Sequence, residues 1–147
     1  MDKIIKQEQR LMTRKQFLDE VLDHIGTPFG HQKRLKGVAV DCAGPIINAG
    51  KKYGVEFEDL KNYSRKPRTE DIINAFYKSG FYDISKEEVM EGDIGLVAYL
   101  GNIQHMVVIT RTNPLYICHA VTDKFVAEHR NNLEIARFLR YSKFIGE

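Results

Sequence analysis

The sequence has few cysteines and no long hydrophobic run. Its two cysteines, Cys42 and Cys118, could form at most one disulfide, and a chain of 147 residues with 43% hydrophobic residues does not need a cross-link to hold its core. No apolar stretch is long enough to span a bilayer, and residues 1–14 lack the apolar centre of a secretory signal. We therefore expect no membrane insertion and no signal peptide.

A strong excess of charge is also missing. The chain carries 22 Lys and Arg against 20 Asp and Glu, which leaves a net charge of +2. Lys33, Arg34 and Lys36 cluster, but no long basic stripe interleaved with aromatic residues follows, so nucleic acid is not an expected partner. Length and composition predict a single domain over residues 1–147, a monomer, with residues 1–12 as a flexible arm.

Helical and strand-like periodicities occupy different halves of the chain. Three segments have apolar residues at helical spacing and end at a glycine, namely 13–26, which begins with a Thr13–Gln16 capping box, 44–54, which begins near a proline, and 69–80, which Thr69 would cap. Residues 33–37 are expected to be a polar loop, residues 55–68 largely a loop, and Ser85 with Glu88 would cap a single turn. After Asp93 the pattern changes to short runs rich in Val, Ile, Tyr and Phe, at 94–99, 105–111, 115–120, 124–129 and 135–141. This order predicts an α+β fold in which N-terminal helices pack on a C-terminal antiparallel meander.

Cys42 directly precedes the second predicted helix. It is followed by the small residues Ala43 and Gly44 and by Pro45, which suits a first helical turn. A helix N-terminus carries partial positive charge, which we expect to lower the thiol pKa below its free value of about 8.5. Cys42 is therefore a candidate nucleophile, and a nucleophile of this kind needs a base.

Two of the five histidines fall on neighbouring predicted strands. If residues 111–113 form a three-residue hairpin loop, His105 lies directly across from His119 on one sheet face. A register slip of two residues would leave the two rings as diagonal neighbours, whereas a slip of one would separate them. The pattern predicts Cys42 as nucleophile, His105 as general base and His119 as the group that orients His105.

Simpler interpretations of these residues stay open. Cys42 could be a buried structural thiol, and Cys42, His105 and His119 together could bind zinc, although the spacing typical of zinc sites is missing. We expect no metal and no other cofactor. His24 is predicted to lie on the surface near a helix end, and His31 and His129 either line a cleft or are solvated.

Several short motifs resemble those of one family. The D-C-S-G, P-G-D, H-V-G-I and I-H-A motifs of the NlpC/P60 cell-wall cysteine peptidases have counterparts, in this order, at 41–44, 91–93, 105–108 and 117–120. Residues 25–29 and 36–42 resemble the L-G-T-P-Y and G-V-G-x-D-C motifs of members that are encoded by phages and associated with tails or gene transfer agents. The resemblance extends over about residues 17–141.

The resemblance implies a papain-like fold and a peptidoglycan hydrolase. Cys42 would be the nucleophile, His105 the base and His119 the third member of a triad that cleaves amide bonds of peptidoglycan stem peptides, of the D-γ-glutamyl-diamino acid type, through a thioester. The stem peptide would be the substrate and phage tail proteins further partners. The protein would then be associated with a virion, or cytoplasmic until released. No substrate-binding residues carry over, because the loops that would form the cleft match no motif.

Three departures from the family pattern bear on activity. Ala43 replaces the serine that usually follows the nucleophile, Phe29 stands where a tyrosine is common, and Val107 replaces the glycine after the base. Losing the hydroxyl at Phe29 removes a donor that could support the reaction. The alternative interpretations are a phage tail assembly or structural protein that keeps the fold but is weakly active or inactive, and a related thiol enzyme with another amide or acyl substrate.

Overall fold

The computed structural model describes residues 12–60 and 67–147. Of the predicted arm, residues 1–11 lie outside the described residues, whereas Met12 is fully buried and contributes to the core. Part of the segment 55–68, expected to be a loop, also lies outside them.

Three helices occupy the segments in which helices were predicted. They are α2 (Arg14–Leu22), α3 (Gly44–Lys52) and α4 (Thr69–Lys78). The predicted capping box of α2 is present, since the Thr13 hydroxyl accepts from Gln16 N–H and the Gln16 side chain accepts from Thr13 N–H. The prediction that Thr69 caps α4 is wrong. Arg68 is the N-cap, and the Thr69 hydroxyl instead accepts a hydrogen bond from the main chain of Ile103.

The strands form a six-stranded antiparallel sheet in the order β3-β8-β4-β5-β6-β7. Their bounds are β3 Phe81–Ile84, β4 Ile94–Tyr99, β5 Asn102–Arg111, β6 Tyr116–Ala120, β7 Val126–Arg130 and β8 Ile135–Tyr141. Strands β4 to β7 follow the predicted meander, but β8 returns to pair with both β4 and β3. Periodicity identifies a strand without identifying its partner, so neither the return of β8 nor the short strand β3 was predicted.

Two smaller elements occur in segments predicted to be irregular or a single turn. The short hairpin of β1 (Arg34–Leu35) and β2 (Ala39–Val40) lies partly in the segment 33–37, which was expected to be a polar loop. A single turn of 3-10 helix, η2, spans Lys86–Glu88 after Ser85. The hairpin leads the chain directly into Cys42 and α3.

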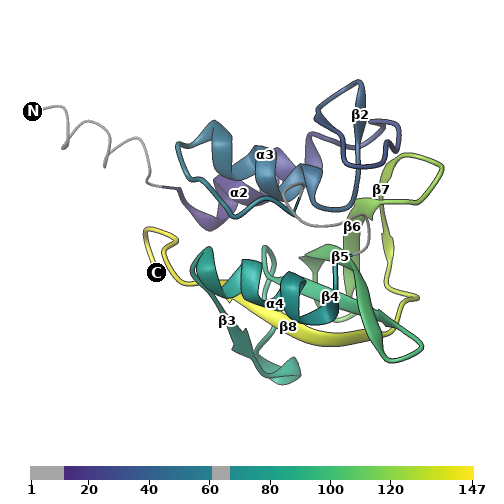
Figure 1. Ribbon diagram of the computed structural model, residues 1–147. Coiled ribbons are helices and arrows are strands. Elements are labelled where there is room, and N and C mark those ends of the chain that lie inside the picture. The colour runs from purple at the N-terminus through teal and green to yellow at the C-terminus, as the bar shows by residue number, and fades with distance from the viewer. Residues whose placement is uncertain (1–11, 61–66) are drawn as a thin grey trace, which may run out of the picture.

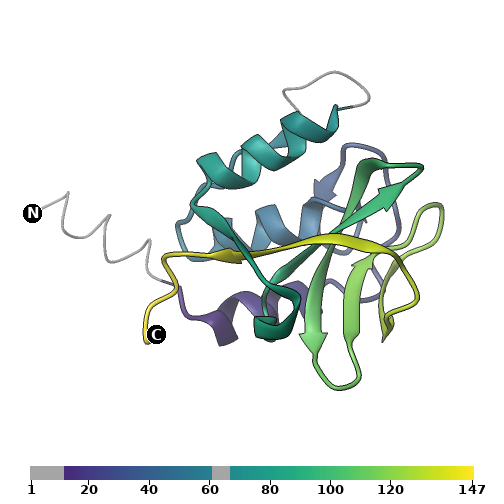
Figure 2. The same cartoon turned by 90° about the horizontal axis from the view of Figure 1, so that it is seen from below.

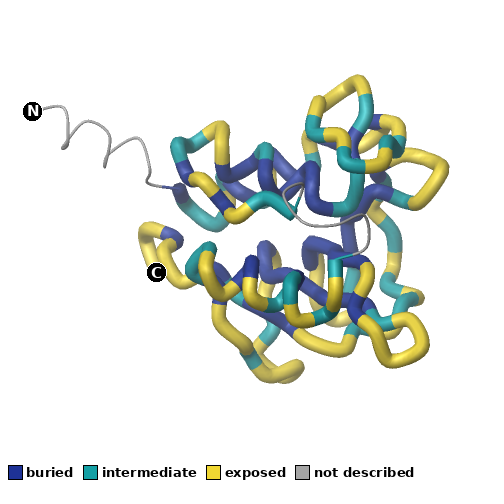
Figure 3. Tube along the Cα trace, viewed as in Figure 1, coloured by how far each residue is buried: buried dark blue, intermediate teal, exposed yellow. Residues whose placement is uncertain are grey.

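The sheet buries apolar residues on both of its faces. Consecutive residues of β4, Leu96 and Val97, belong to two different buried clusters, as do Val107 and Val108 of β5. This alternation places one cluster between the sheet and the helices and the other on the opposite face. Figure 3 shows the buried segments concentrated along the strands and along α3.

The helices lie across the sheet, and the beginning of α3 comes close to its strands. Figure 1 shows α2 and α3 together above the strands, with α4 in front, and Figure 2 shows the three helices in the order α2, α3, α4 across the molecule. In Figure 1 the β1–β2 hairpin lies beside the loop that joins β6 and β7. The segment before the hairpin joins the two, since Pro28 pairs with Phe125 of that loop and Phe29 pairs with Val40 of β2.

A buried carboxylate joins α2 to two strands. Asp93 is fully buried and forms ion pairs with Arg14 of α2 and Arg140 of β8, at 2.9 Å each. Its Oδ2 also accepts a hydrogen bond from Met90 N–H. The aspartate of the P-G-D-like motif therefore holds the framework together at a distance from the pocket that contains Cys42.

Candidate active site

The turn before α3 holds Cys42 at the start of the helix. The carboxylate of Asp41 accepts hydrogen bonds from the main-chain N–H of Ala43 and Gln32, at 3.0 and 3.1 Å. The Arg34 guanidinium donates to the same carboxylate and to Asp59, and its side chain is only 8% exposed. Residue 41 of the D-C motif thus fixes the main chain that follows Cys42 and ties this turn to the segment at Gln32.

Cys42 and His105 line the same pocket. This pocket has a volume of about 890 Å³, and its walls come from the segment 29–34, the start of α3, the start of α4 and strand β5. Phe29, His31 and Arg34 are part of the lining. Among the residues that the structure describes, no hydrogen bond joins the Cys42 thiol to His105. The structure thus brings thiol and imidazole to one cavity in which a substrate could lie between them.

His105 and His119 are in direct contact. His105 Nε2 and His119 Nδ1 are 2.7 Å apart, and the two rings meet edge to face with centroids 4.8 Å apart. The predicted register is wrong by two residues, since Val108 pairs with Cys118 and a bulge follows Ile109. The two histidines are therefore diagonal neighbours rather than directly opposed, and a shift of two residues keeps both side chains on one face.

A third histidine extends the pair. His119 Nε2 lies 2.8 Å from His129 Nε2, and His129 Nδ1 lies 2.8 Å from the main-chain oxygen of Arg130. From the sequence alone, His129 could either line a cleft or be solvated. The signal that could have found this contact is the second hairpin, where Ile117 pairs with His129 and places it diagonally across from His119.

The environment sets the protonation of the site. Burial, with a contribution from Asp41, raises the pKa of the Cys42 thiol to about 12, so the lowered pKa expected from the helix terminus is not found. Burial lowers the pKa of His105 to about 4, and burial with the neighbouring rings lowers that of His119 to about 3. At neutral pH the site holds a neutral thiol and a neutral imidazole, which is the arrangement that general-base activation requires.

The other histidines have different environments. The prediction for His24 is wrong, because this ring is fully buried, its Nδ1 lies 2.7 Å from the Glu20 carbonyl oxygen, and its Nε2 lies 3.1 Å from Asn48. His31 is exposed and lines the pocket that contains Cys42. No group of three or more His, Cys, Asp or Glu within residues 12–60 and 67–147 is arranged to hold a metal ion. Both cysteines are free, and Cys118 is buried.

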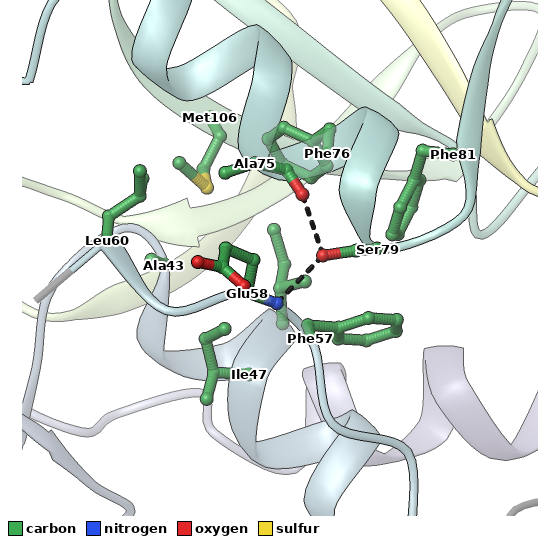
Figure 4. A pocket seen from close by; sticks show the side chains of 11 residues that line it. Ala43, Ile47, Phe57, Glu58, Leu60, Ala75, Phe76, Ser79, Phe81 and Met106 are labelled. Carbon is green, nitrogen blue, oxygen red and sulfur yellow. Dashed lines mark hydrogen bonds between the residues drawn. The ribbon is translucent and has the colours of Figure 1, made fainter. Parts of the chain in front are cut away.

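An apolar cavity adjoins the pocket. It lies between α3 and α4, and it shares Ala43, Leu60 and Met106 with the larger pocket. Figure 4 shows its side chains converging, with the Ser79 hydroxyl bonded to the main chain of Ala75 and Glu58. The residue that replaces the family's serine, Ala43, therefore contributes a methyl group to an apolar wall.

The described fold resembles solved structures of one class. A lipoprotein-like protein of the NLP/P60 family from Staphylococcus aureus matches 87% of this chain and 41% of its own, with 18% identity and a TM-score of 0.64. The peptidoglycan hydrolase RipB from Mycobacterium tuberculosis matches 87% and 66%, with 17% identity and a TM-score of 0.57. RipD from the same organism, a non-catalytic NlpC/p60 domain protein, matches 86% and 95%, with 18% identity and a TM-score of 0.56.

The comparisons establish the fold. The chain has the predicted α+β, papain-like fold of NlpC/P60 domains, and it spans less than half of the staphylococcal protein. Neither a protein-family model nor a curated protein matches its sequence. Within the described part of the chain, no helix combines the length and apolar character needed to cross a membrane.

Proposed function

We propose that this protein is a cysteine peptidase or amidase that hydrolyses amide bonds in the stem peptides of peptidoglycan. The observation that carries the proposal is the position of His105. This residue lines the Cys42 pocket, and its Nε2 lies 2.7 Å from Nδ1 of His119. A thiol, an imidazole and a group that orients the imidazole are the components of thiol-dependent acyl transfer. The similarity to the structures of peptidoglycan hydrolases supports the substrate class.

The residues of the pocket would act in two stages. In the first, the Cys42 S–H proton passes to His105 while sulfur forms a bond to the amide carbonyl carbon, and His105 then protonates the departing amine nitrogen as the C–N bond breaks. In the second, His105 takes a proton from water, whose oxygen attacks the thioester and displaces the thiol. The carboxylic acid leaves, and Cys42 regains its proton.

The test is the release of new amino termini from isolated sacculi. We expect Cys42→Ala to lower this release at least about a thousandfold, because no nucleophile remains, while the protein stays folded by circular dichroism. Cys118→Ala is the matched control, since Cys118 is 1% exposed and outside the pocket, and it should keep the activity. Equal release by wild-type protein and Cys42→Ala would refute the proposal.

The bond that is cleaved can be read from the products. The resemblance of the motifs predicts cleavage between D-γ-glutamate and the diamino acid. Mass spectrometry of muropeptides after digestion would then show disaccharide dipeptides together with free peptides that begin at the diamino acid. Products cut at another amide bond would keep the enzyme class and change the substrate assignment.

A specific observation favours a second candidate, a non-catalytic domain that binds peptidoglycan or serves in a tail structure. The Cys42 thiol has a pKa raised to about 12 and has no hydrogen bond to His105 among the described residues. The similar protein RipD is non-catalytic and adapted to peptidoglycan binding. Sacculus binding by the wild-type protein without release of amino termini would establish this candidate.

The biological setting is a separate proposal that rests on the sequence motifs. The segments 25–29 and 36–42 support a phage or prophage protein that acts on the wall as part of a tail. Antibodies against the protein should then label purified virions of the phage that encodes it. Absence from those virions would contradict the tail setting and leave the proposed reaction unaffected.

A further inference from the structure

We propose that His129 is a positioning residue that, through the main-chain oxygen of Arg130, sets where the protons lie on three successive imidazole rings. The rings of His105, His119 and His129 form a continuous chain that ends on this oxygen, with each link between 2.7 and 2.8 Å. The consequence for catalysis rests on the proposed function. The proton positions themselves are a property of the resting protein.

The direction of the chain follows from its last link. A carbonyl oxygen can only accept a hydrogen bond, so His129 Nδ1 must carry a proton and donate to Arg130 O. A neutral imidazole has one protonated and one bare nitrogen. In the neutral form of His129, Nε2 is therefore bare and can only accept.

The same rule then applies to the next two rings. His119 Nε2 must donate to His129 Nε2, which leaves His119 Nδ1 bare as an acceptor. His105 Nε2 must in turn donate to His119 Nδ1. The remaining nitrogen, His105 Nδ1, is bare and is the one available to take a proton from Cys42.

The proton positions depend on neutral rings, and burial favours the neutral form of an imidazole. His105 and His119 are 9% and 7% exposed, and burial lowers the pKa of both rings. His129 is half-buried at the rim, where Tyr99, Lys124 and Arg130 line the adjoining hollows. Among the described residues, the two buried rings have no other hydrogen-bond partner, so the terminal carbonyl is the group that decides between the two possible directions of the chain.

Reversing the direction would disable the base. If the group at position 129 donated to His119 Nε2, His119 Nδ1 would carry the proton, His105 Nε2 would accept, and His105 Nδ1 would be protonated. The thiol would then face an N–H group and not a lone pair. A wrong tautomer in a catalytic triad costs about 10⁴ in kcat even when the geometry is kept.

The test uses two variants that differ in hydrogen-bond direction. Histidine nitrogen-15 NMR on the full chain at neutral pH should show the proton on Nε2 in His105 and His119 and on Nδ1 in His129. His129→Glu, which can only accept, should keep the tautomers of the other two rings and about a tenth or more of kcat/KM. His129→Lys, which can only donate, should place the proton of His105 on Nδ1 and lower kcat at least about a hundredfold.

The outcomes separate this proposal from the proposed function. A wild-type His105 with its proton on Nδ1, or unchanged tautomers in His129→Lys, would overturn the positioning role whether or not the protein hydrolyses anything. A purely structural role for His129 predicts equal effects of Glu and Lys, which would also overturn it. His31→Phe, on another wall of the pocket, is the control and should leave the tautomers of His105 and His119 unchanged. If the tautomers are as expected but no amide is cleaved, only the proposed function fails.

Discussion

At the scale of single residues, the candidate nucleophile is controlled by its neighbours as much as by its place before a helix. The carboxylate of Asp41 holds the turn through Ala43 N–H and also contributes a negative charge beside the sulfur. Arg34 offsets part of this charge, but burial dominates and keeps the thiol protonated. In the proposed mechanism, activation of Cys42 therefore depends on transfer of its proton to His105 during the reaction.

This dependence predicts how Cys42 reacts with an alkylating agent. We expect iodoacetamide to modify Cys42 faster than Cys118, because Cys42 lines a pocket while Cys118 is 1% exposed and the pKa of each thiol is raised to about 12. His105→Ala should slow modification of Cys42 about a hundredfold at pH 7, with the rate then rising as the pH is increased. Intact-protein mass spectrometry over time measures both rates.

A matched variant tests whether the base is specific. His31→Ala removes another imidazole from the same pocket and should leave the rate of Cys42 modification within about threefold of wild type. Equal slowing by His31→Ala and His105→Ala would show that the modification rate of Cys42 falls on loss of either pocket side chain. The assignment of His105 as the base would then be refuted.

At the scale of elements, the position of α3 depends on a close approach at its first residue. A Cβ atom built on Gly44 would lie 2.6 Å from Val40 Cβ, which is closer than real Cβ contacts allow. Val40 belongs to β2, is fully buried and accepts a hydrogen bond from Gly30 N–H. Gly44, two residues after Cys42, lets the helix start directly against the strand that precedes Cys42.

Gly44→Ala should therefore destabilise the protein, although alanine is the better helix former by about 1 kcal/mol. We expect a loss of about 1–3 kcal/mol in the free energy of unfolding, because neither the main chain of α3 nor that of β2 can move away without displacing the Cys42 turn. Urea denaturation measures the change. Lys51→Ala, an exposed change in the same helix, is the control, and greater stability of Gly44→Ala would contradict the expected clash.

At the scale of the whole molecule, the fold keeps ionisable groups in its interior and its stability must depend on pH. His105 and His119 have pKa values lowered to about 4 and about 3 in the folded state, against about 6.5 in the unfolded chain. Below pH 6.5 the unfolded chain therefore binds protons that the folded protein does not. The stability contributed by the neutral rings is complete above pH 6.5 and is lost as the pH falls toward 4 and then 3.

We expect these two rings to lower the free energy of unfolding by about 3 kcal/mol each, about 6 kcal/mol together, between pH 7 and pH 4. Denaturant titrations at several pH values measure it. The double variant His105→Gln with His119→Gln should show a clearly smaller fall, because its unfolded chain no longer gains these two protons. His31→Gln, at an exposed position, is the comparison. An equal fall in the double variant would assign the acid sensitivity to other groups.

The sequence by itself determined the elements and the chemical types in the site. Periods of about 3.6 and of 2 identified the three helices and five of the six strands of the large sheet, because these patterns reflect which side of an element is buried. The same local reasoning selected Cys42, His105 and His119, and the structure brings His105 against His119 and into one pocket with Cys42.

Only the tertiary structure decided the pairing of β8 with β4, the two-residue register shift, the buried state of His24 and the contact of His129 with His119. Strand partners and bulges depend on contacts between segments far apart in the chain, which no local period encodes. Burial likewise depends on what packs over a residue, and for this reason a helix N-terminus predicted a lowered pKa for Cys42 while the folded protein raises it.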